Sequence, residues 1–425
     1  MNWRLRYRLR LYFQNSLWIL PTLSIVAALI AVSVLTNYEK SVGSYTDISA
    51  DTVRLILSTV ATSTFTLVVL VSSAVLLAIQ LASAQLTPRI ISLIYRTPYQ
   101  KLAFAVFVFS FTFSASLLTR IEDSAPRIAS YAAAYGFLLD IALFILFIDN
   151  VGKMLRPSSA LRVVALTGRG VIRAAYPTLL KDDSAPPVEI KAITAEQSRT
   201  VLSSIDGAVL AFDTKGLVNM AARYKCVIEL VPEVGQFVAE GDPLFRVYRG
   251  GEGLSESALR DSVAKGEERT FEQDPLFAFR ILVDIASKAL SPAINDPTTA
   301  VLALDQIHHL LRDVGKRYLG HGHETDGAGE VRLIYRRPNW DDFVLLSMTE
   351  TRHYGRDSMQ VQRRLRAMLT DLIETLPPRR VPILKKELAL LATSSKRTFQ
   401  DVADQNLATE GDLQGIGGSY DEIEN

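Results

Sequence analysis

Four long apolar runs occupy the first 156 residues of this 425-residue chain. The longest extends from Leu55 to Pro88 and contains 34 residues without a charged side chain. A helix crosses the hydrocarbon core of a bilayer in about 20 apolar residues. At 1.5 Å per residue, a helix over the whole run is about 50 Å long, so it must tilt, break or extend beyond the membrane. The run therefore predicts a chain anchored in a bilayer.

Three further runs with few or no charges predict three further spans: residues 11–38, Leu102–Thr119 and Ser130–Val151. Several arginines precede the first run, as they do in a secretory signal peptide. That run is too long for a signal peptide, however, and no small-residue cleavage site follows Leu35. We therefore expect a retained anchor and a four-helix transmembrane bundle in residues 1–156.

Lysine and arginine are unevenly divided between the segments that separate the four runs. If the N-terminus is inside, twelve of them lie in inner segments: Arg4, Arg6, Arg8, Arg10, Arg89, Arg96, Lys101, Lys153, Arg156, Arg162, Arg169 and Arg173. Only four lie in outer segments: Lys40, Arg54, Arg120 and Arg127. Cytoplasmic segments of membrane proteins carry an excess of these residues. We therefore predict that both termini are cytoplasmic.

Composition limits the classes of protein to which the chain can belong. A net charge of +1 gives no electrostatic footprint for nucleic acid. The single cysteine, Cys226, cannot form an intramolecular disulfide. The sequence has neither a Gly-Lys-Ser/Thr phosphate-binding loop nor a Gly-x-Ser-x-Gly nucleophile elbow. We expect no nucleic-acid partner, no cofactor and no enzymatic activity.

The remaining two-thirds of the chain read as soluble segments on the cytosolic side. Residues 157–185 predict an amphipathic linker, whose basic side suits either an anionic membrane surface or an ordinary surface helix. Short strands separated by turn residues predict a small β-domain over 186–250. Helical patterns follow over 251–400, with a Gly-rich loop at 315–330, and the acidic residues 401–425 read as a disordered tail.

Within the β-domain, the segment Val234-Gly-Gln-Phe-Val-Ala-Glu-Gly-Asp-Pro-Leu-Phe-Arg-Val247 resembles the closing hairpin of biotinyl/lipoyl-like barrel-sandwich domains. The carrier versions of that fold bear a lysine between methionines, and this sequence has no Met-Lys-Met. The resemblance therefore implies a small structural barrel without a swinging cofactor arm.

Two further stretches carry a resemblance over nearly the whole chain. The first, Leu81-Ala-Ser-Ala-Gln-Leu-Thr-Pro-Arg89, ends the long second run. The second is Leu282-Val-Asp-Ile-Ala-Ser-Lys-Ala-Leu-Ser-Pro-Ala-Ile-Asn-Asp-Pro-Thr-Thr-Ala300. Together they resemble a bacterial family of predicted inner-membrane proteins, domain-of-unknown-function family 2254. The resemblance implies a bacterial inner-membrane location and no particular activity.

Polar residues inside the predicted spans are candidates for an ion pathway. Asp140 lies in the fourth run among apolar neighbours, where an ionised carboxylate must pair, protonate or meet water. A stripe at helical spacing follows the second run: Thr59, Thr62, Thr66, Ser73, Gln80 and Ser83. The stripe suits a hydrated lumen, but small polar residues more commonly allow helices to pack closely. Asp140 likewise fits either a pathway or one interhelical hydrogen bond.

The turn Ser291–Pro297 is a candidate contact for a ligand or a second subunit. Asn295 and Asp296 are suited to cap a helix that begins at Pro297. A helix N-terminus also attracts anions, and Lys288 or Arg280 would add positive charge. The candidate residues are Lys288, Ser291, Asn295 and Asp296, and capping alone accounts equally for the last two.

A metal site receives little support from the sequence. His321, His323, Glu324 and Asp326 lie close together, with His308 and His309 nearby. They match no established zinc-binding pattern, and the loop around them reads as solvated. We expect no metal.

These features favour a homo-oligomeric channel or pore with a cytosolic vestibule or ligand-sensing domain. The long second helix would lie at the axis of the oligomer, and the partners would be the lipid bilayer, further copies of the chain and a small ion or ligand. The alternative is a membrane scaffold or sensor without transport, which recruits a cytosolic partner.

Overall fold

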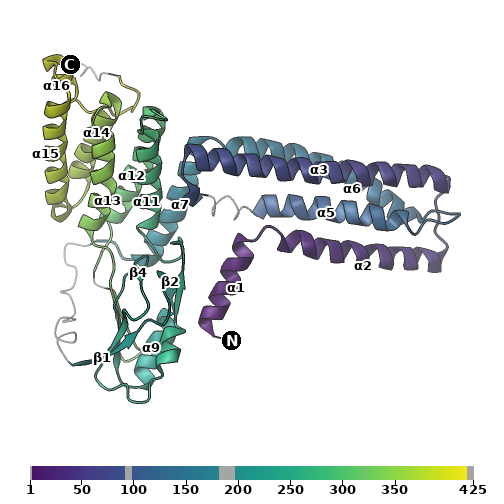
Figure 1. Cartoon of the computed structure of the whole chain (residues 1–425), viewed down its shortest axis with the longest axis horizontal. Helices are drawn as coiled ribbons and strands as arrows, with labels where there is room; N and C mark the ends of the chain where they lie inside the picture. The colour runs from purple at the N-terminus through teal and green to yellow at the C-terminus, as the bar shows by residue number, and fades with distance from the viewer. Residues whose placement is uncertain (1, 91–97, 181–196, 321, 419–425) are drawn as a thin grey trace. The chain divides into compact units, whose positions relative to one another are not determined.

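The computed structural model describes residues 2–90, 98–180, 197–320 and 322–418. The chain divides into two compact units, labelled by element in Figure 1. One unit is formed by residues 11–160, and the other combines residues 1–10 with 161–425. The first half of helix α1 (Trp3–Asn15) therefore belongs with the soluble part of the chain.

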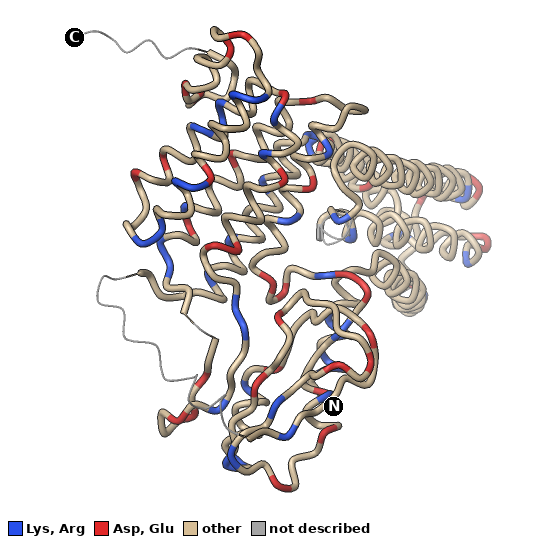
Figure 2. The backbone as a smooth tube through the Cα atoms, turned by 60° about the vertical axis from the view of Figure 1, so that its left-hand side comes forward, with Lys and Arg blue, Asp and Glu red and all other residues tan. Residues whose placement is uncertain are grey.

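The unit of residues 11–160 contains four helices that are long and apolar enough to cross a membrane. They are α2 (Ile19–Val42), α3 (Ala50–Gln85), α5 (Pro98–Leu118) and α6 (Arg127–Met154). Each corresponds to one of the four apolar runs, so the prediction of four apolar helices is confirmed. In Figure 2 charged residues are sparse along these helices and gather near their ends.

Helix α3 is an unbroken helix of 36 residues. At 1.5 Å per residue it is about 54 Å long, which exceeds a hydrocarbon core of about 30 Å. It begins where the Ser49 side chain accepts a hydrogen bond from the Thr52 amide. It ends at Gln85, three residues before Pro88, where a short 3-10 turn η1 (Pro88–Ile90) follows. A proline cannot continue a helix, which accounts for the end of α3 shortly before Pro88.

One end of this unit is fastened by charged side chains. Glu39 of α2 is fully buried and caps α6, accepting hydrogen bonds from the amides of Ile128 and Ala129. Arg54 of α3 donates to the carbonyls of Ile121 and Glu122 at 3.0 and 2.9 Å. These bonds hold the α2–α3 and α5–α6 loops together at the same end of the helices.

The β-region of the second unit forms two sheets. The five-stranded sheet has the order β1-β5-β3-β8-β7, and the three-stranded sheet has the order β4-β2-β6. All neighbours are antiparallel except β3 and β8, which pair in parallel. The strands are β1 (Ser198–Leu202), β2 (Gly207–Phe212), β3 (Val227–Leu230), β4 (Phe237–Val238), β5 (Pro243–Tyr248), β6 (Val263–Gly266), β7 (Gly322–Thr325) and β8 (Val331–Tyr335).

The predicted closed barrel is wrong for the described residues, which form these two sheets instead. Three of the strands come from beyond residue 250, where the sequence predicts only helices and a loop. The 315–330 segment, predicted as a loop, contributes β7 and is extended by β8. Gly235 and Gly241 both adopt positive φ, at 88° and 87°, as turn residues do. The predicted hairpin itself is wrong, because β4 pairs with β2 in one sheet and β5 pairs with β1 and β3 in the other. Helices α9 (Thr214–Arg223) and α10 (Glu256–Arg260) complete this region.

Five helices form the rest of the soluble unit: α11 (Phe277–Ala289), α12 (Pro297–Gly315), α13 (Trp340–Tyr354), α14 (Met359–Thr375) and α15 (Val381–Thr398). Helix α12 packs between α11 and α14, and α15 packs on α14. A short turn η2 (Pro378–Arg380) precedes α15. Helix α11 is buried around most of its circumference, because Phe277, Ala278 and Phe279 are all buried in a single turn.

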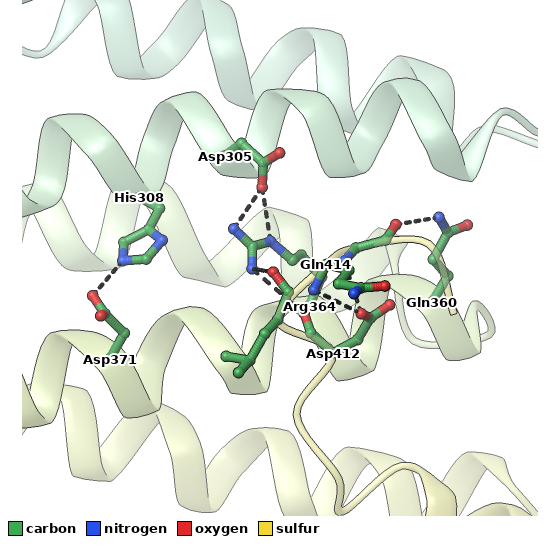
Figure 3. A network of polar contacts seen from close by, with 9 residues as sticks. Asp305, His308, Gln360, Arg364, Asp371, Asp412 and Gln414 are labelled. Atoms are coloured by element: carbon green, nitrogen blue, oxygen red, sulfur yellow. Dashed lines mark hydrogen bonds and ion pairs between the residues drawn. The ribbon is translucent and has the colours of Figure 1, made fainter. Parts of the chain in front are cut away.

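The segment after α15 is structured as far as residue 418, contrary to the predicted disordered tail. Helix α16 (Val402–Leu407) leads into a strap, residues 408–418, that lies on α14 (Figure 3). Arg363 is 2% exposed and donates to the carbonyls of Glu410, Gly417 and Gly418. Further bonds run from Arg364 to the Asp412 and Leu413 carbonyls, from Arg366 to the Ala408 carbonyl and from Gln360 to the Gly415 carbonyl. Residues 419–425 lie outside the described part.

Helix α7 (Pro157–Ala175) is the amphipathic helix that the sequence predicts. Its buried side includes Gly168, where an added Cβ would lie 2.2 Å from the Cβ of Ala278 in α11. On its basic side, Arg169 and Arg173 pair with Asp313 of α12 at 3.2 and 3.3 Å. Burial acts to raise the pKa of Asp313, but Arg317 and these two arginines hold it below its usual value. The packing favours the interpretation of α7 as an ordinary surface helix.

Candidate functional site

The most unusual polar residue of the apolar helices is Asp140, which is fully buried in α6. Its Oδ1 accepts a hydrogen bond of 3.1 Å from Ser110 of α5, and its Oδ2 accepts one of 3.4 Å from Thr64 of α3. Three helices therefore meet at one carboxyl group. Hydroxyl donors satisfy a carboxyl group that water does not reach inside a membrane.

Apolar layers enclose this polar site on both sides along the helices. Asp140 lies seven residues from Ala133 on one side and seven from Phe147 on the other. Thr64 has the same spacing from Leu57 and Val71. The first cluster contains Ala28, Val32, Val53, Leu57, Phe113, Leu117, Ile121, Ala125, Ala129 and Ala133, and the second contains Val71, Val75, Ala78, Ala103, Phe107, Phe147 and Val151. A single bundle is therefore closed by side chains above and below Asp140.

The predicted stripe on α3 faces away from this site. At about 100° per residue, Thr59, Thr62, Thr66, Ser73 and Gln80 fall within an arc of roughly 60°, and Thr64 lies on the opposite side of the helix. These five of the six stripe residues are exposed on the single chain, whereas the sixth, Ser83, is half-buried. Three of the hydroxyls donate to carbonyls of their own helix: Thr59 to Leu55, Thr66 to Thr62 and Ser73 to Val69. The structure therefore does not bring the stripe together with Asp140 within one chain, and pore lining stays a prediction.

Sequence reasoning missed Thr64 and Ser110 as the partners of Asp140. A signal for Thr64 was present, because its seven-residue spacing from Leu57 and Val71 places it on the apolar face of α3. Ser110 sits within a phenylalanine-rich segment whose every side is apolar, so spacing alone does not indicate which side meets α6.

The Ser291–Pro297 turn adopts the predicted capping arrangement. Asp296 caps α12 by accepting a 3.0 Å hydrogen bond from the Thr299 amide, and Pro297 occupies the first turn. Asn295 has a φ of 48° and its amide bonds to the Ser291 carbonyl at 2.8 Å. Ser291 in turn donates to the Lys288 carbonyl. The capping prediction is confirmed for Asp296, whereas the Asn295 side chain caps no amide among the described residues. The ligand or subunit contact stays a prediction.

Arg280, considered as an aid to anion binding at this turn, is engaged elsewhere. It donates to both oxygens of Glu350 at 2.6 Å and to Asp284 at 2.7 Å. The hydrogen bonds that Arg280 donates to Glu350 are the main cause that holds the pKa of Arg280 above its usual value. This arginine is therefore not available to an anion at the α12 N-terminus.

The potential metal-binding residues are separated or paired. His321 lies outside the described residues. Asp326 pairs with Arg332 at 2.6 Å, and His308 contacts Asp371 at 2.7 Å. No group of three or more His, Cys, Asp or Glu residues able to hold a metal ion occurs among residues 2–90, 98–180, 197–320 and 322–418.

Comparison with known proteins places the chain in a family. Residues 14–371 match the family model described as predicted membrane protein (DUF2254). The chain belongs to the DUF2254 family. The match covers the four apolar helices, both sheets and the helical region through most of α14, so it includes Asp140 and the Ser291–Pro297 turn.

DUF2254 relatives occur in mycobacteria. Uncharacterised proteins of Mycobacterium bovis and Mycobacterium tuberculosis are each 25% identical over 414 residues, covering 93% of this chain and 79% of the relative. No solved structure matches the chain. The comparisons therefore give the family and its membrane character.

Proposed function

We propose that this DUF2254 protein is a homo-oligomeric pore of the bacterial inner membrane, with a cytosolic domain that senses a ligand. The observation that carries the proposal is the polar face of α3, which is exposed on the outside of the single bundle. Copies that meet around this face would enclose a lumen lined by Thr59, Thr62, Thr66 and Ser73. The apolar clusters on either side of Asp140 favour a pathway between copies over one through a bundle.

Gln80 extends the same face and strengthens the argument. A hydroxyl on a helix satisfies its donor with the carbonyl one turn back, and so tolerates lipid. A carboxamide has two donors and an acceptor, which its own helix does not satisfy. Within the described part of the chain, Gln80 makes no hydrogen bond to another residue. Water in a lumen or vestibule, or a neighbouring copy, would supply hydrogen-bond partners for the Gln80 carboxamide.

The orientation is part of the proposal. Four crossings bring both flanks of the helical unit to the same side of the membrane. Asn2 donates to Asp261 at 2.9 Å, and Arg4 lies 3.9 Å from the same residue. These contacts support a common side of the membrane for the two flanks. The excess of basic residues on the inner segments favours the cytoplasm for that side.

Flux from liposomes tests the pore. Thr66→Val and Ser73→Ala remove hydroxyls from the proposed lumen and should lower ion flux by several-fold without changing the oligomer measured in detergent. Thr22→Val is the matched control: Thr22 is also exposed and also donates to a carbonyl one turn back, but it lies on α2. An unchanged flux in both α3 variants, or a monomer in detergent, would contradict the proposal.

Asp140→Asn separates the two possible pathways. The asparagine retains the shape and removes the charge, so in a pore between copies it should leave flux close to the wild-type level. A large change of conductance or ion preference in Asp140→Asn, together with wild-type flux in Thr66→Val and Ser73→Ala, would indicate a pathway inside the bundle instead.

The second candidate function is a membrane sensor without transport, which recruits a cytosolic partner. The apolar clusters on either side of Asp140 favour this second candidate, because they leave no pathway for ions through a single bundle. A complete lack of flux from an intact oligomer, in all salts and pH values, would assign the protein to this class.

A further inference from the structure

The soluble unit contains a cavity of about 370 Å³ at the C-terminal end of α7. Its walls come from α7, the end of β2, the start of α9, the segment before α11, strand β7 and the residues from Tyr335 to Pro338. All these elements belong to the same compact unit. Cavities that hold small ligands in proteins typically have volumes of about 300–1,000 Å³.

One part of the cavity wall is apolar and aromatic. Val171 and Ala175 of α7, together with Val234 and Pro275, supply aliphatic surface. The rings of Phe212 and Tyr335 pack edge to face, with centroids 4.9 Å apart. This wall suits a compact hydrocarbon group.

Arg336 and Arg337 both line the cavity, and Arg337 is the one held between aromatic rings. Its guanidinium carbon lies 4.7 Å from the ring centroid of Tyr335 and 5.8 Å from that of Tyr176. Its Nη2 donates to the Tyr335 hydroxyl and lies 3.6 Å from Glu324. Its Nε and Nη1 donate to no other group in the described part of the chain. The aromatic rings therefore hold the Arg337 guanidinium in place, and its Nε and Nη1 can donate hydrogen bonds to a ligand.

Carboxylates supply the negative charge. Glu324 accepts a 3.0 Å hydrogen bond from the Tyr335 hydroxyl, and Glu272 lines the same cavity. Burial raises the pKa of Tyr335 to about 12, so this hydroxyl stays protonated and remains a donor at neutral pH. The cavity thus presents acidic and basic groups beside an apolar wall.

We propose that this cavity binds a small zwitterion with an apolar side chain, of the class of the free aliphatic and aromatic amino acids. The ligand carboxylate would bind Arg337, its ammonium group would bind Glu272 or Glu324, and its side chain would occupy the wall formed by Val171, Ala175 and Pro275. A ligand that carries both charges can form charge-assisted hydrogen bonds to the arginine and to a carboxylate at the same time, which a ligand with a single charge cannot do.

The site deepens the ligand-sensing part of the proposed function. Helix α7 follows α6 after only Leu155 and Arg156. A ligand at the C-terminal end of α7 therefore contacts a helix that leads directly from an apolar span. The binding itself does not depend on whether the protein conducts ions.

Calorimetric titration of the full-length protein in detergent tests the site. Leucine and phenylalanine are the probes, and each is compared with the analogue that lacks the carboxylate (isoamylamine, phenethylamine) or the ammonium group (isocaproate, hydrocinnamate). We expect the amino acids to bind and the analogues to bind at least about tenfold more weakly, because each loses a charge-assisted hydrogen bond. No binding by either amino acid, or equal binding by the analogues, would overturn the proposal.

Variants locate the binding. Arg337→Gln should weaken leucine binding at least about tenfold, and Ala175→Leu, which fills the cavity without removing a charge, should abolish it. Arg312→Gln is the control, because this arginine is 45% exposed and lies outside the cavity. Wild-type affinity in Ala175→Leu, confirmed as folded by its unfolding temperature, would refute the site. Flux plays no part in this measurement, so failure of the pore proposal is distinguishable from failure of this one.

Discussion

His308 links α12 to α14 through a hydrogen bond of 2.7 Å between Nε2 and Asp371 (Figure 3). Its side chain is 17% exposed. Burial lowers the pKa of His308, Arg364 and Arg312 lower it further, and Asp371 opposes them. The folded chain therefore binds a proton at this position less readily than the unfolded chain, whose imidazole titrates near pH 6.5.

This difference predicts how stability depends on pH. The free energy of unfolding should fall as the pH decreases below about 6.5, by up to about 1.4 kcal/mol per unit, until the folded histidine also binds its proton. His308→Gln removes the titration and should flatten this slope, whereas the exposed His309→Gln should retain it. Urea unfolding at a series of pH values measures both, and identical slopes in His308→Gln and wild type would contradict the prediction.

At the scale of single residues, the sequence predicts helix caps and helix ends better than it predicts the hydrogen-bond partners of buried residues. Asp296 and Pro88 act through their own backbone surroundings, which the neighbouring residues determine. Thr64 and Ser110 meet Asp140 only because three helices come together at one level. That level depends on the packing of all three, which no single stretch of sequence contains.

Helix α7 depends on one close approach to α11. Gly168→Ala would place a methyl carbon about 2.2 Å from that of Ala278, so the helices must separate. Overpacking of this kind costs about 1–3 kcal/mol. We expect Gly168→Ala to lower the free energy of unfolding by that amount, followed through the fluorescence of the buried Trp340.

Two variants sharpen this test. Gly170 lies two residues further on the same helix, and an added Cβ there meets no atom within 4 Å. Gly170→Ala should therefore leave stability unchanged or raise it by up to about 1 kcal/mol through helix propensity. Ala278→Gly should restore part of the stability lost in Gly168→Ala, and strictly additive losses in the double variant would refute the proposed contact.

The elements of the β-region show where sequence reasoning stops. Strands β2, β3 and β5 lie where alternation and turn residues predict them. The barrel was wrong because the neighbour of β3 in the sheet is β8, about 100 residues further along the chain, and it pairs in parallel. Strand length and periodicity identify a strand, but they do not identify its neighbour when the partner is distant.

At the scale of the whole molecule, the four crossings make a topology prediction. The Thr46 amide bonds to the Ala125 carbonyl at 3.1 Å, so the α2–α3 and α5–α6 loops lie at the same end of the helical unit. With both termini in the cytoplasm, as proposed, a cysteine in the α5–α6 loop should face the periplasm. Cys226, the single native cysteine, is buried and can be replaced by alanine as a background.

In that background, Asp123→Cys should react with a membrane-impermeant maleimide in intact cells stripped of their outer membrane. Glu240→Cys, on an exposed turn of the soluble unit, should react only after permeabilisation. The reverse pattern would invert the orientation. Labelling of both residues in sealed cells would contradict the four-span topology.

The strap of residues 408–418 has a consequence for how the protein is made. It is the last described part of the chain to leave the ribosome, after all four apolar helices have been synthesised. Until it arrives, Arg363 lacks the carbonyls of Glu410, Gly417 and Gly418, and water has to supply the acceptors for its guanidinium. A nascent chain that has been synthesised only as far as α15 therefore lacks three hydrogen bonds of Arg363, and this part of α14 reaches its final packing only after residues 408–418 have been added.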